Sequence, residues 1–262
     1  MIVERAEHPT WTSNAYLLGD EDGGHGVLVD SNGVEGPLLD QVAARRLTIT
    51  HVLVTHQHGD HVVDVAGLAR RFGVPTVGSR ETAEAGVPID ETIGDGDVVT
   101  TGDLVIRAIA TPGHCPGHLA LLVDESDCLT ADCLFKGTIG GTVGGGMSGY
   151  ADQRHSIMER LMTLPPETRI HPGHTLPTTV GAEWESNPFI RIWRGVDPEG
   201  TETCRVRGEE ATLILFGPDY DGTHKAWVRY PDGRDAIIGG SQVERETTGF
   251  PPKPSLPGSP PA

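Results

Sequence analysis

One short stretch of the chain limits what the fold can be. An apolar run at residues 52–54, typical of a buried strand, leads into four metal-binding side chains: His56, His58, Asp60 and His61. His56 and His58 are two residues apart, so on an extended backbone they point to the same side. A glycine before Asp60 lets the chain turn, so the second pair can face the same cavity from another direction. The stretch can therefore supply ligands to two neighbouring metal ions.

A His-rich surface turn is the alternative interpretation of this stretch. Four such residues at one strand end favour a metal site, because sites in layered α/β folds form where buried strands end. Neutral imidazole and carboxylate suit zinc, iron, manganese or cobalt. Val62, Val65, Ala66 and Ala69 share one helical face, so we expect His61 to begin a helix that runs to residue 71.

Three more candidate ligands follow at the ends of later strands. His114 has Pro-Gly on both sides, which predicts a rigid loop after an apolar strand. Asp132 ends another apolar strand, where a buried carboxylate is costly unless it is paired or bound to a metal. A cap of the following loop is the alternative for Asp132 taken alone. His174 repeats the Pro-Gly-His pattern of His114 and completes a set of five histidines and two aspartates.

Some nearby polar residues are expected to lie outside the ligand set. His118 and Lys136 are candidates for contacting the ligands rather than the metal ions. For His118, the alternative is a hydrogen-bonded histidine of the core. His171 is expected to serve local structure. Cys115 is adjacent to His114 and is expected to pack in the core rather than to bind a metal.

Composition and charge narrow the classes of function. The chain has 262 residues, with 37 acidic and 20 basic side chains and a formal net charge of −17. This charge argues against non-specific nucleic-acid binding and against an anionic membrane surface as a partner. The sequence shows no signal-peptide pattern and no run of about 18 apolar residues. Without an export signal, its four cysteines are expected to be free thiols in a reducing cytoplasm. We expect the partner to be a small-molecule substrate.

The pattern of elements predicts two structural parts and a tail. Alternating strands and helices predict a layered α/β domain over residues 1–195. Short strands and a Pro-Asp-Gly turn predict a small all-β module over 200–247, with a weak resemblance to SH3-like barrels. The module is expected to bind a partner, pack over the site or mediate a homodimer. Residues 248–262 are rich in proline and are expected to be a disordered tail.

A glycine-rich segment follows Asp132 in the sequence. Residues 136–149 contain seven glycines, and we interpret them as a mobile substrate loop. A phosphate-binding loop is the rival interpretation. It is disfavoured because no Gly-Lys-Ser or Gly-Lys-Thr follows and no strand-loop-helix pattern fits.

The order and spacing of the candidate ligands resemble those of the metallo-β-lactamase fold superfamily: His56-x-His58-x-Asp60-His61, His114, Asp132 and His174. The resemblance covers roughly residues 1–194. Within the superfamily, three motifs are most similar to glyoxalase II-like hydrolases: Thr111-Pro-Gly-His-Cys-Pro-Gly-His118, Asp132-Cys-Leu-Phe135 and Pro172-Gly-His-Thr-Leu-Pro-Thr-Thr179.

The resemblance implies a fold and an assignment of ligands. The fold is a four-layer αβ/βα sandwich. One metal is held by His56, His58 and His114, and the other by Asp60, His61 and His174, with Asp132 between the two.

Two features depart from the family pattern. Gly140-Gly-Thr-Val143 stands where members commonly have Gly-Arg-Thr-Asp, and the helical C-terminal domain that helps glyoxalase II to hold glutathione is absent. The second departure argues against glutathione thioesters as substrates.

We predict a dinuclear metal-dependent hydrolase that cleaves a thioester, or a related ester or lactone, by attack of a metal-bound hydroxide. Asp60, His58 and Asp132 are the predicted catalytic residues. The predicted cofactors are two divalent metal ions, with zinc expected and iron or manganese as alternatives. The first rival is a mononuclear-iron persulfide dioxygenase of the same fold. The second rival is a partner-binding protein with a vestigial site.

Overall fold

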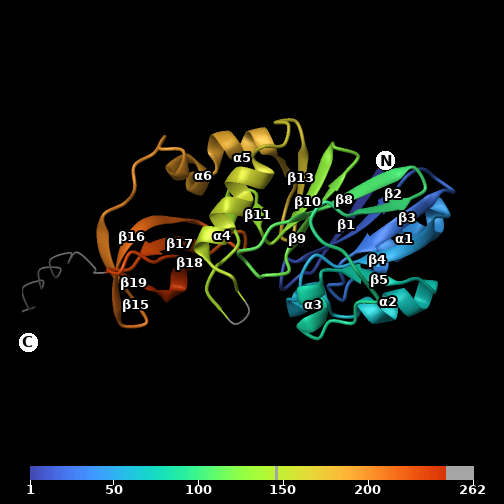
Figure 1. Cartoon of the computed structure of the whole chain (residues 1–262), viewed down its shortest axis with the longest axis horizontal. Coiled ribbons are helices and arrows are strands. Elements are labelled where there is room, and N and C mark those ends of the chain that lie inside the picture. The colour runs from blue at the N-terminus through green and yellow to red at the C-terminus, as the bar shows by residue number, and fades with distance from the viewer. Residues whose placement is uncertain (145–146, 246–262) are drawn as a thin grey trace, which may run out of the picture.

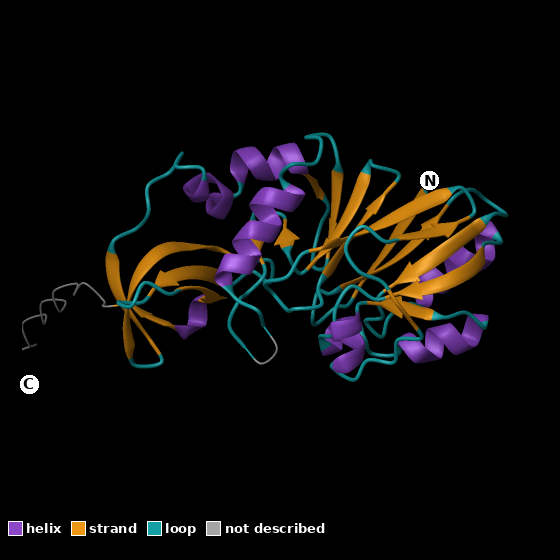
Figure 2. Cartoon of the chain, in the orientation of Figure 1, coloured by secondary structure: helices purple, strands orange, loops and turns teal. Residues whose placement is uncertain are grey.

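The computed structural model describes residues 1–144 and 147–245. Two six-stranded sheets pack face to face at its centre, and helices cover their outer faces (Figure 1 and Figure 2). The predicted tail over 248–262, and residues 145 and 146 of the glycine-rich segment, lie outside the described residues. Every helix in the described part of the chain is too short or too polar to cross a membrane.

The first sheet has the order β1-β2-β3-β4-β5-β6. Its first three strands are antiparallel and the others join in parallel, which requires connections that cross the outer face of the sheet. The strands are β1 (Ile2–Glu7), β2 (Asn14–Gly19), β3 (His25–Val29), β4 (Thr48–Leu53), β5 (Thr76–Gly78) and β6 (Glu91–Thr92). The connecting helices are α1 (Gly36–Arg45), α2 (Val65–Phe72) and α3 (Arg80–Glu84).

The second sheet has the order β14-β13-β10-β9-β8-β7. Its strands are β7 (Val98–Thr101), β8 (Leu104–Ala110), β9 (Leu119–Val123), β10 (Asp127–Ala131), β13 (Arg169–Pro172) and β14 (Thr178–Thr179). β10 and β13 are parallel to each other, so this sheet is also mixed. Leu18 and Leu53 of the first sheet share an apolar core with Ile106 and Leu121 of the second.

A second helical layer covers the outer face of the second sheet. It consists of α4 (Tyr150–His155), a π-helical turn η2 (Ser156–Leu161), α5 (Val180–Ser186) and α6 (Pro188–Trp193). Ile157 and Phe189 from this layer are fully buried against Leu122 and Ile170 of the sheet. A two-stranded hairpin lies beside it, formed by β11 (Leu134–Phe135) and β12 (Thr138–Ile139). The four layers confirm the predicted αβ/βα sandwich.

A separate antiparallel sheet of five strands forms the C-terminal module, in the order β18-β17-β16-β15-β19. Its elements are β15 (Glu202–Val206), β16 (Glu209–Pro218), β17 (His224–Arg229), β18 (Asp235–Gly239), a 3₁₀ turn η3 (Gly240–Gln242) and β19 (Val243–Arg245). The all-β character of this module is confirmed. The boundaries predicted at 1–195 and 200–247, and a homodimer through the module, stay predictions.

The module is docked firmly on the helical layer of the second sheet. Trp227 and Ile237 of the module belong to the same apolar cluster as Ile157 and Phe189. Thr142 and Ile237 exchange two hydrogen bonds of 2.9 Å, from Thr142 N to Ile237 O and from Ile237 N to Thr142 Oγ1. In Figure 1, β17 and β18 lie beside α4. The two parts of the chain therefore share one core.

The helix predicted to begin at His61 begins four residues later. His61 ends a 3₁₀ turn η1 (Gly59–His61), and α2 starts at Val65. The intervening residues are held by the loop after β3, because Ser31 O accepts from Val63 N (2.9 Å) and Ser31 Oγ accepts from Asp64 N (2.9 Å). The Asp64 side chain then caps α2 by accepting from Gly67 N.

We expect Trp227→Ala to lower the free energy of unfolding by about 3–5 kcal/mol, because the indole is buried where the module meets the helical layer. Denaturant unfolding followed by circular dichroism would measure this change. Val105→Ala, at a side chain that is 47% exposed, is the matched control and should change stability little. A loss below about 1 kcal/mol for Trp227→Ala would contradict the shared core.

Candidate metal centre

Six of the predicted ligands form two groups of three. The ligand atoms of each group lie within 4.8 Å of one another, with His56, His58 and His114 in one group and Asp60, His61 and His174 in the other. They come from segments that follow β4, β8 and β13, at the edge where strands of both sheets end. This is the edge at which layered α/β folds place their sites.

The seventh predicted ligand, Asp132, lies between the two groups. Its Oδ1 is 3.3 Å from His61 Nε2, and its Oδ2 is 3.4 Å from His114 Nε2 and 3.3 Å from His174 Nε2. His56 Nε2 lies 4.0 Å from the same Oδ2. One carboxylate therefore faces both groups and is placed to bridge two metal ions.

Several polar atoms that face this centre have no hydrogen-bond partner among the described residues. His56 Nε2, His61 Nε2 and Asp132 Oδ1 are buried and unpartnered, which is costly unless another group satisfies them. A metal ion accepts electron pairs from imidazole nitrogen and carboxylate oxygen, so it would satisfy all three. The residues present therefore fit the pair of metal ions that the sequence predicts.

The stretch Asp30-Ser-Asn-Gly33 has a turn-like sequence, and in the structure its first residue, Asp30, fixes the orientation of two ligands. Its carboxylate accepts from His61 Nδ1 (3.1 Å), Thr55 N (2.8 Å) and Thr55 Oγ1 (2.8 Å). Thr55 Oγ1 in turn accepts from His56 Nδ1 (3.0 Å). These bonds direct Nε2 of both His56 and His61 toward the centre. Asp30 lies near both rings, but its bonds make it a support rather than a ligand.

Asp30 could be found from the sequence only through the pairing of strands. It follows β3, which runs parallel to β4, so both strands end at the same edge. Its backbone is left-handed, with a φ of 61°, which aspartate tolerates better than most residues. The turn-like sequence therefore agrees with the local backbone but does not indicate that the carboxylate is buried.

A glutamine side chain joins the loop of His114 to the loop of Asp132. Gln153 accepts from His114 N (2.9 Å) and donates to Cys133 O (2.7 Å). Gly113 allows this approach, because a Cβ at that position would lie 2.4 Å from the Gln153 Cα and its φ is 140°. His114 Nδ1 donates to Gly141 O (3.0 Å), which leaves Nε2 to face the centre.

His174 is held by the segment that precedes β2. Its Nδ1 donates to Trp11 O (3.1 Å), so Nε2 faces Asp132 and Asp60. The preceding residue must be glycine, because a Cβ on Gly173 would lie 2.1 Å from Asp132 Oδ1. Close contact between backbone and carboxylate therefore positions this ligand.

The structure separates the residues that were expected to lie outside the ligand set. His118 is buried, accepts from Asp132 N (3.1 Å) and donates to Thr111 Oγ1 (2.8 Å), so it holds the backbone of a ligand. His171 contacts Asp127 instead (2.7 Å). Lys136 is exposed after β11, and its predicted supporting role stays a prediction.

Burial sets the protonation of the centre. It lowers the pKa of His114 to about 4 and that of His118 to about 3, and it lowers the pKa of His56 well below the ordinary value. Burial also lowers the pKa of His61, but Asp132 and Asp30 raise it more, so it lies well above its ordinary value. Metal binding therefore requires His61 to lose a proton.

A cavity of about 230 Å³ opens beside the centre. His114 and Asp132 of the metal centre line it, together with Tyr220, Lys225 and Gln242 of the C-terminal module. The Tyr220 ring stacks on His174, with ring centroids 4.2 Å apart and planes 19° apart. No local pattern in the sequence predicts this contact, because it depends on how the module docks.

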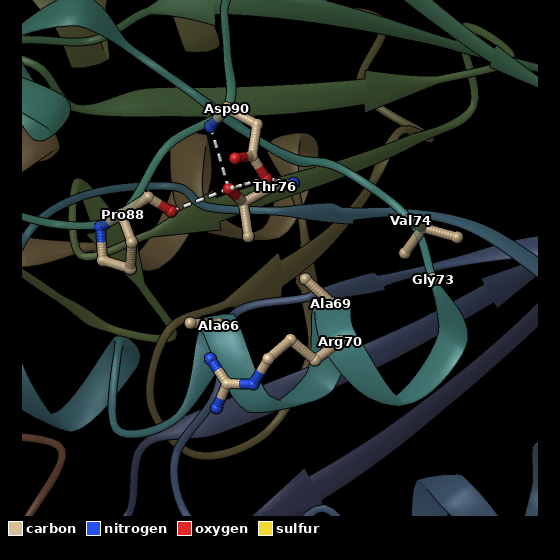
Figure 3. Close-up of a pocket in the computed structure, with 8 residues that line it drawn as sticks. All are labelled: Ala66, Ala69, Arg70, Gly73, Val74, Thr76, Pro88 and Asp90. Atoms are coloured by element: carbon tan, nitrogen blue, oxygen red, sulfur yellow. Dashed lines mark hydrogen bonds between the residues drawn. The ribbon is translucent and has the colours of Figure 1, made fainter.

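A different hollow lies between α2 and β5 (Figure 3). Its polar groups bond to one another, since Thr76 Oγ1 donates to Pro88 O (2.7 Å) and accepts from Asp90 N (2.9 Å). Within the described residues, its lining contains none of the unpartnered buried atoms that mark the metal centre. We interpret it as a surface gap between elements.

Comparison with protein families agrees with this geometry. Residues 8–174 match the family model described as the metallo-beta-lactamase superfamily. The chain belongs to the metallo-β-lactamase superfamily. A hydroxyacylglutathione hydrolase of Rhizobium meliloti (strain 1021) is 33% identical over 212 residues, which cover 67% of this chain and 81% of that protein.

Two solved structures that are similar to this chain bear on the site. ETHE1 from Myxococcus xanthus is 31% identical with a TM-score of 0.65, and the match covers 75% of this chain and 92% of that one. TTHA1623 in a di-iron-bound form is 29% identical with a TM-score of 0.59, and the match covers 72% of this chain and 100% of that one. About a quarter of the chain therefore lies outside the part shared with these structures.

We expect this superfamily member, purified without chelator, to contain about two divalent metal ions per chain, and Asp132→Asn to retain fewer than one. The loss follows from removing the negative charge between the two groups. Elemental analysis would measure the metal content. Asp90→Asn, which changes a carboxylate in the hollow of Figure 3, is the control and should retain both ions. Full metal content in Asp132→Asn would overturn the bridging role.

Asp30→Asn is expected to weaken metal binding by about 10–100-fold, because the neutral amide no longer fixes His56 and His61 through a carboxylate. Competition with a chromophoric chelator would measure the affinity. Thr55→Ser keeps the hydroxyl that joins Asp30 to His56, so its affinity should stay within about threefold of the parent. Equal affinities for the parent and Asp30→Asn would show that the carboxylate is dispensable.

Proposed function

We propose that the protein is a metal-dependent hydrolase that cleaves thioesters, or related esters and lactones, of small molecules. The observation that carries the proposal is the presence of two complete groups of three ligands with Asp132 between them. The named relatives support the same chemistry, since several are hydroxyacylglutathione hydrolases of about 30% identity. TTHA1623, which has been solved with two irons, supports a pair of metal ions.

Seven side chains would hold the two metal ions. His56, His58 and His114 would hold one cation, Asp60, His61 and His174 the other, and Asp132 both. Two divalent cations, as zinc, iron or manganese, would lower the pKa of water and polarise a carbonyl.

Asp60 has the position of a group that orients the attacking water. Its side chain is 27% exposed, and its Oδ2 lies 3.6 Å from both His61 Nε2 and His174 Nε2. It is therefore the most open carboxylate of the centre and can accept a hydrogen bond from water. The buried Asp132 instead keeps its negative charge, because His174 and His61 hold its pKa well below the ordinary value against the opposite effect of burial.

A mononuclear-iron persulfide dioxygenase is the second candidate. A set that would hold a single iron favours it, since Asp132 Oδ2 lies 4.0 Å from His56 Nε2 and 3.4 Å from His114 Nε2. The complete second group, Asp60 with His61 and His174, favours the hydrolase instead. The two candidates differ in whether oxygen is consumed.

We expect the metal-loaded protein to hydrolyse a hydroxyacyl thioester of a small thiol without consuming oxygen. Asp60→Asn should lower kcat/KM by roughly 10²–10³-fold, because the carboxylate that orients water is lost. Thiol release and an oxygen electrode would measure the two reactions in parallel, and metal content would be checked for each variant. Oxygen uptake with glutathione persulfide, with no thioester cleavage, would replace the hydrolase by the dioxygenase.

A further inference from the structure

The hairpin between β16 and β17 has a defined tip that reaches the metal centre. Asp219 N donates to Thr223 O (3.0 Å), and the Asp221 carboxylate accepts from Thr223 N (2.9 Å) and Thr223 Oγ1 (2.6 Å). Gly222 has a φ of 79°, which suits the tight turn. This turn places Tyr220 against His174 and against Phe135, whose ring centroid is 4.9 Å away. The tip is therefore part of the wall of the cavity.

Lys225, the second residue of β17, is a buried cation in the same wall. Its side chain is 8% exposed, and its Nζ lies 2.9 Å from Asp219 Oδ2, whose side chain is 6% exposed. The Nζ is also 5.3 Å from the centroid of the Tyr220 ring. Burial of an ammonium is costly, and Asp219 compensates for part of this cost. An ammonium has three N–H donors, so the pair with Asp219 leaves donors for a molecule in the cavity that Lys225 lines.

Gln242 adds a neutral donor to the same wall. Its Oε1 accepts from Arg207 (2.9 Å), so its amide N–H groups remain for other partners. Gln242 lines the cavity together with Lys225. The module side of the cavity thus offers hydrogen-bond donors from Lys225 and Gln242, and carries a positive charge next to one carboxylate. Such a surface suits a ligand group that is negative and has more than one acceptor oxygen.

We propose that the C-terminal module forms the substrate-recognition wall of the metal centre, and that Lys225 with Gln242 binds a carboxylate carried by the thioester substrate. The inference rests on the proposed hydrolase function and specifies its substrate class. The scissile carbonyl lies toward His114 and Asp132, and the carboxylate toward Lys225. The carboxylate belongs either to the thiol or to the acyl group, and these two sources are separated by experiment.

The test uses the full-length, metal-loaded protein and two pairs of matched thioesters. One pair carries lactate on 3-mercaptopropionate or on its neutral isostere 3-mercaptopropionamide. The other pair carries a succinyl or a succinamoyl group on N-acetylcysteamine. The main variant is Lys225→Met with Asp219→Asn, which removes both charges and leaves no buried ion unpaired. Arg234→Met removes a charge from an exposed site of the same module and serves as the control.

The parent protein should show a lower KM for the carboxylate than for the amide in one of the two pairs, and that pair identifies the source. In the double variant, KM for that carboxylate should rise about tenfold or more, as expected for loss of a hydrogen bond to a charged group. KM for the matching amide should change by less than about twofold, and metal content should not change. Arg234→Met should leave all four KM values as in the parent.

Two results would overturn the proposal. An equal rise in KM for carboxylate and amide would show that Lys225 and Asp219 are a structural pair. A parent protein that prefers neither carboxylate over its amide would show that the module does not recognise this group. Cleavage of none of the thioesters would instead count against the hydrolase function. In that case, saturation-transfer NMR with 3-(methylthio)propionate and its amide tests the wall alone, and equal signals from the parent and the double variant would reject it.

Discussion

The buried carboxylate of Asp132 is the charge on which the metal centre depends. It is 6% exposed, and an isolated carboxylate at such a depth would cost several kcal/mol. Its partners are histidines that follow β4, β8 and β13, so the charge is compensated only when both sheets meet at the correct edge. Folding of the four layers and assembly of the centre are therefore the same event.

Hydrogen bonds behind the ligands complete this arrangement. Asp30, Gly141 and Trp11 accept from the Nδ1 atoms of His61, His114 and His174, and each bond leaves Nε2 for the centre. The three acceptors come from three different loops. The orientation of the rings is thus set by two backbone carbonyls and the Asp30 carboxylate, which lie outside the ligand set.

The sequence was most informative where function constrains residue type and spacing within a few positions. The strand ends, the seven convergent side chains and the all-β C-terminal part could all be predicted in this way. Asp30 could not, because its role depends on the pairing of β3 with β4, and its own sequence reads as a turn. Tyr220 and Lys225 could not, because their position follows from the docking of Trp227 and Ile237 on a distant helical layer. The start of α2 was misplaced because bonds to Ser31 compete with the helix.

The shared core beneath the C-terminal module has a consequence for how quickly a ligand can bind. Local opening of β17 would expose Trp227 and Ile237, so its free energy approaches that of unfolding the whole chain. The wall that carries Tyr220 is therefore already in place before a ligand arrives. A preorganised cavity loses little conformational entropy on binding, and association is then governed by diffusion through its mouth rather than by a slow conformational change.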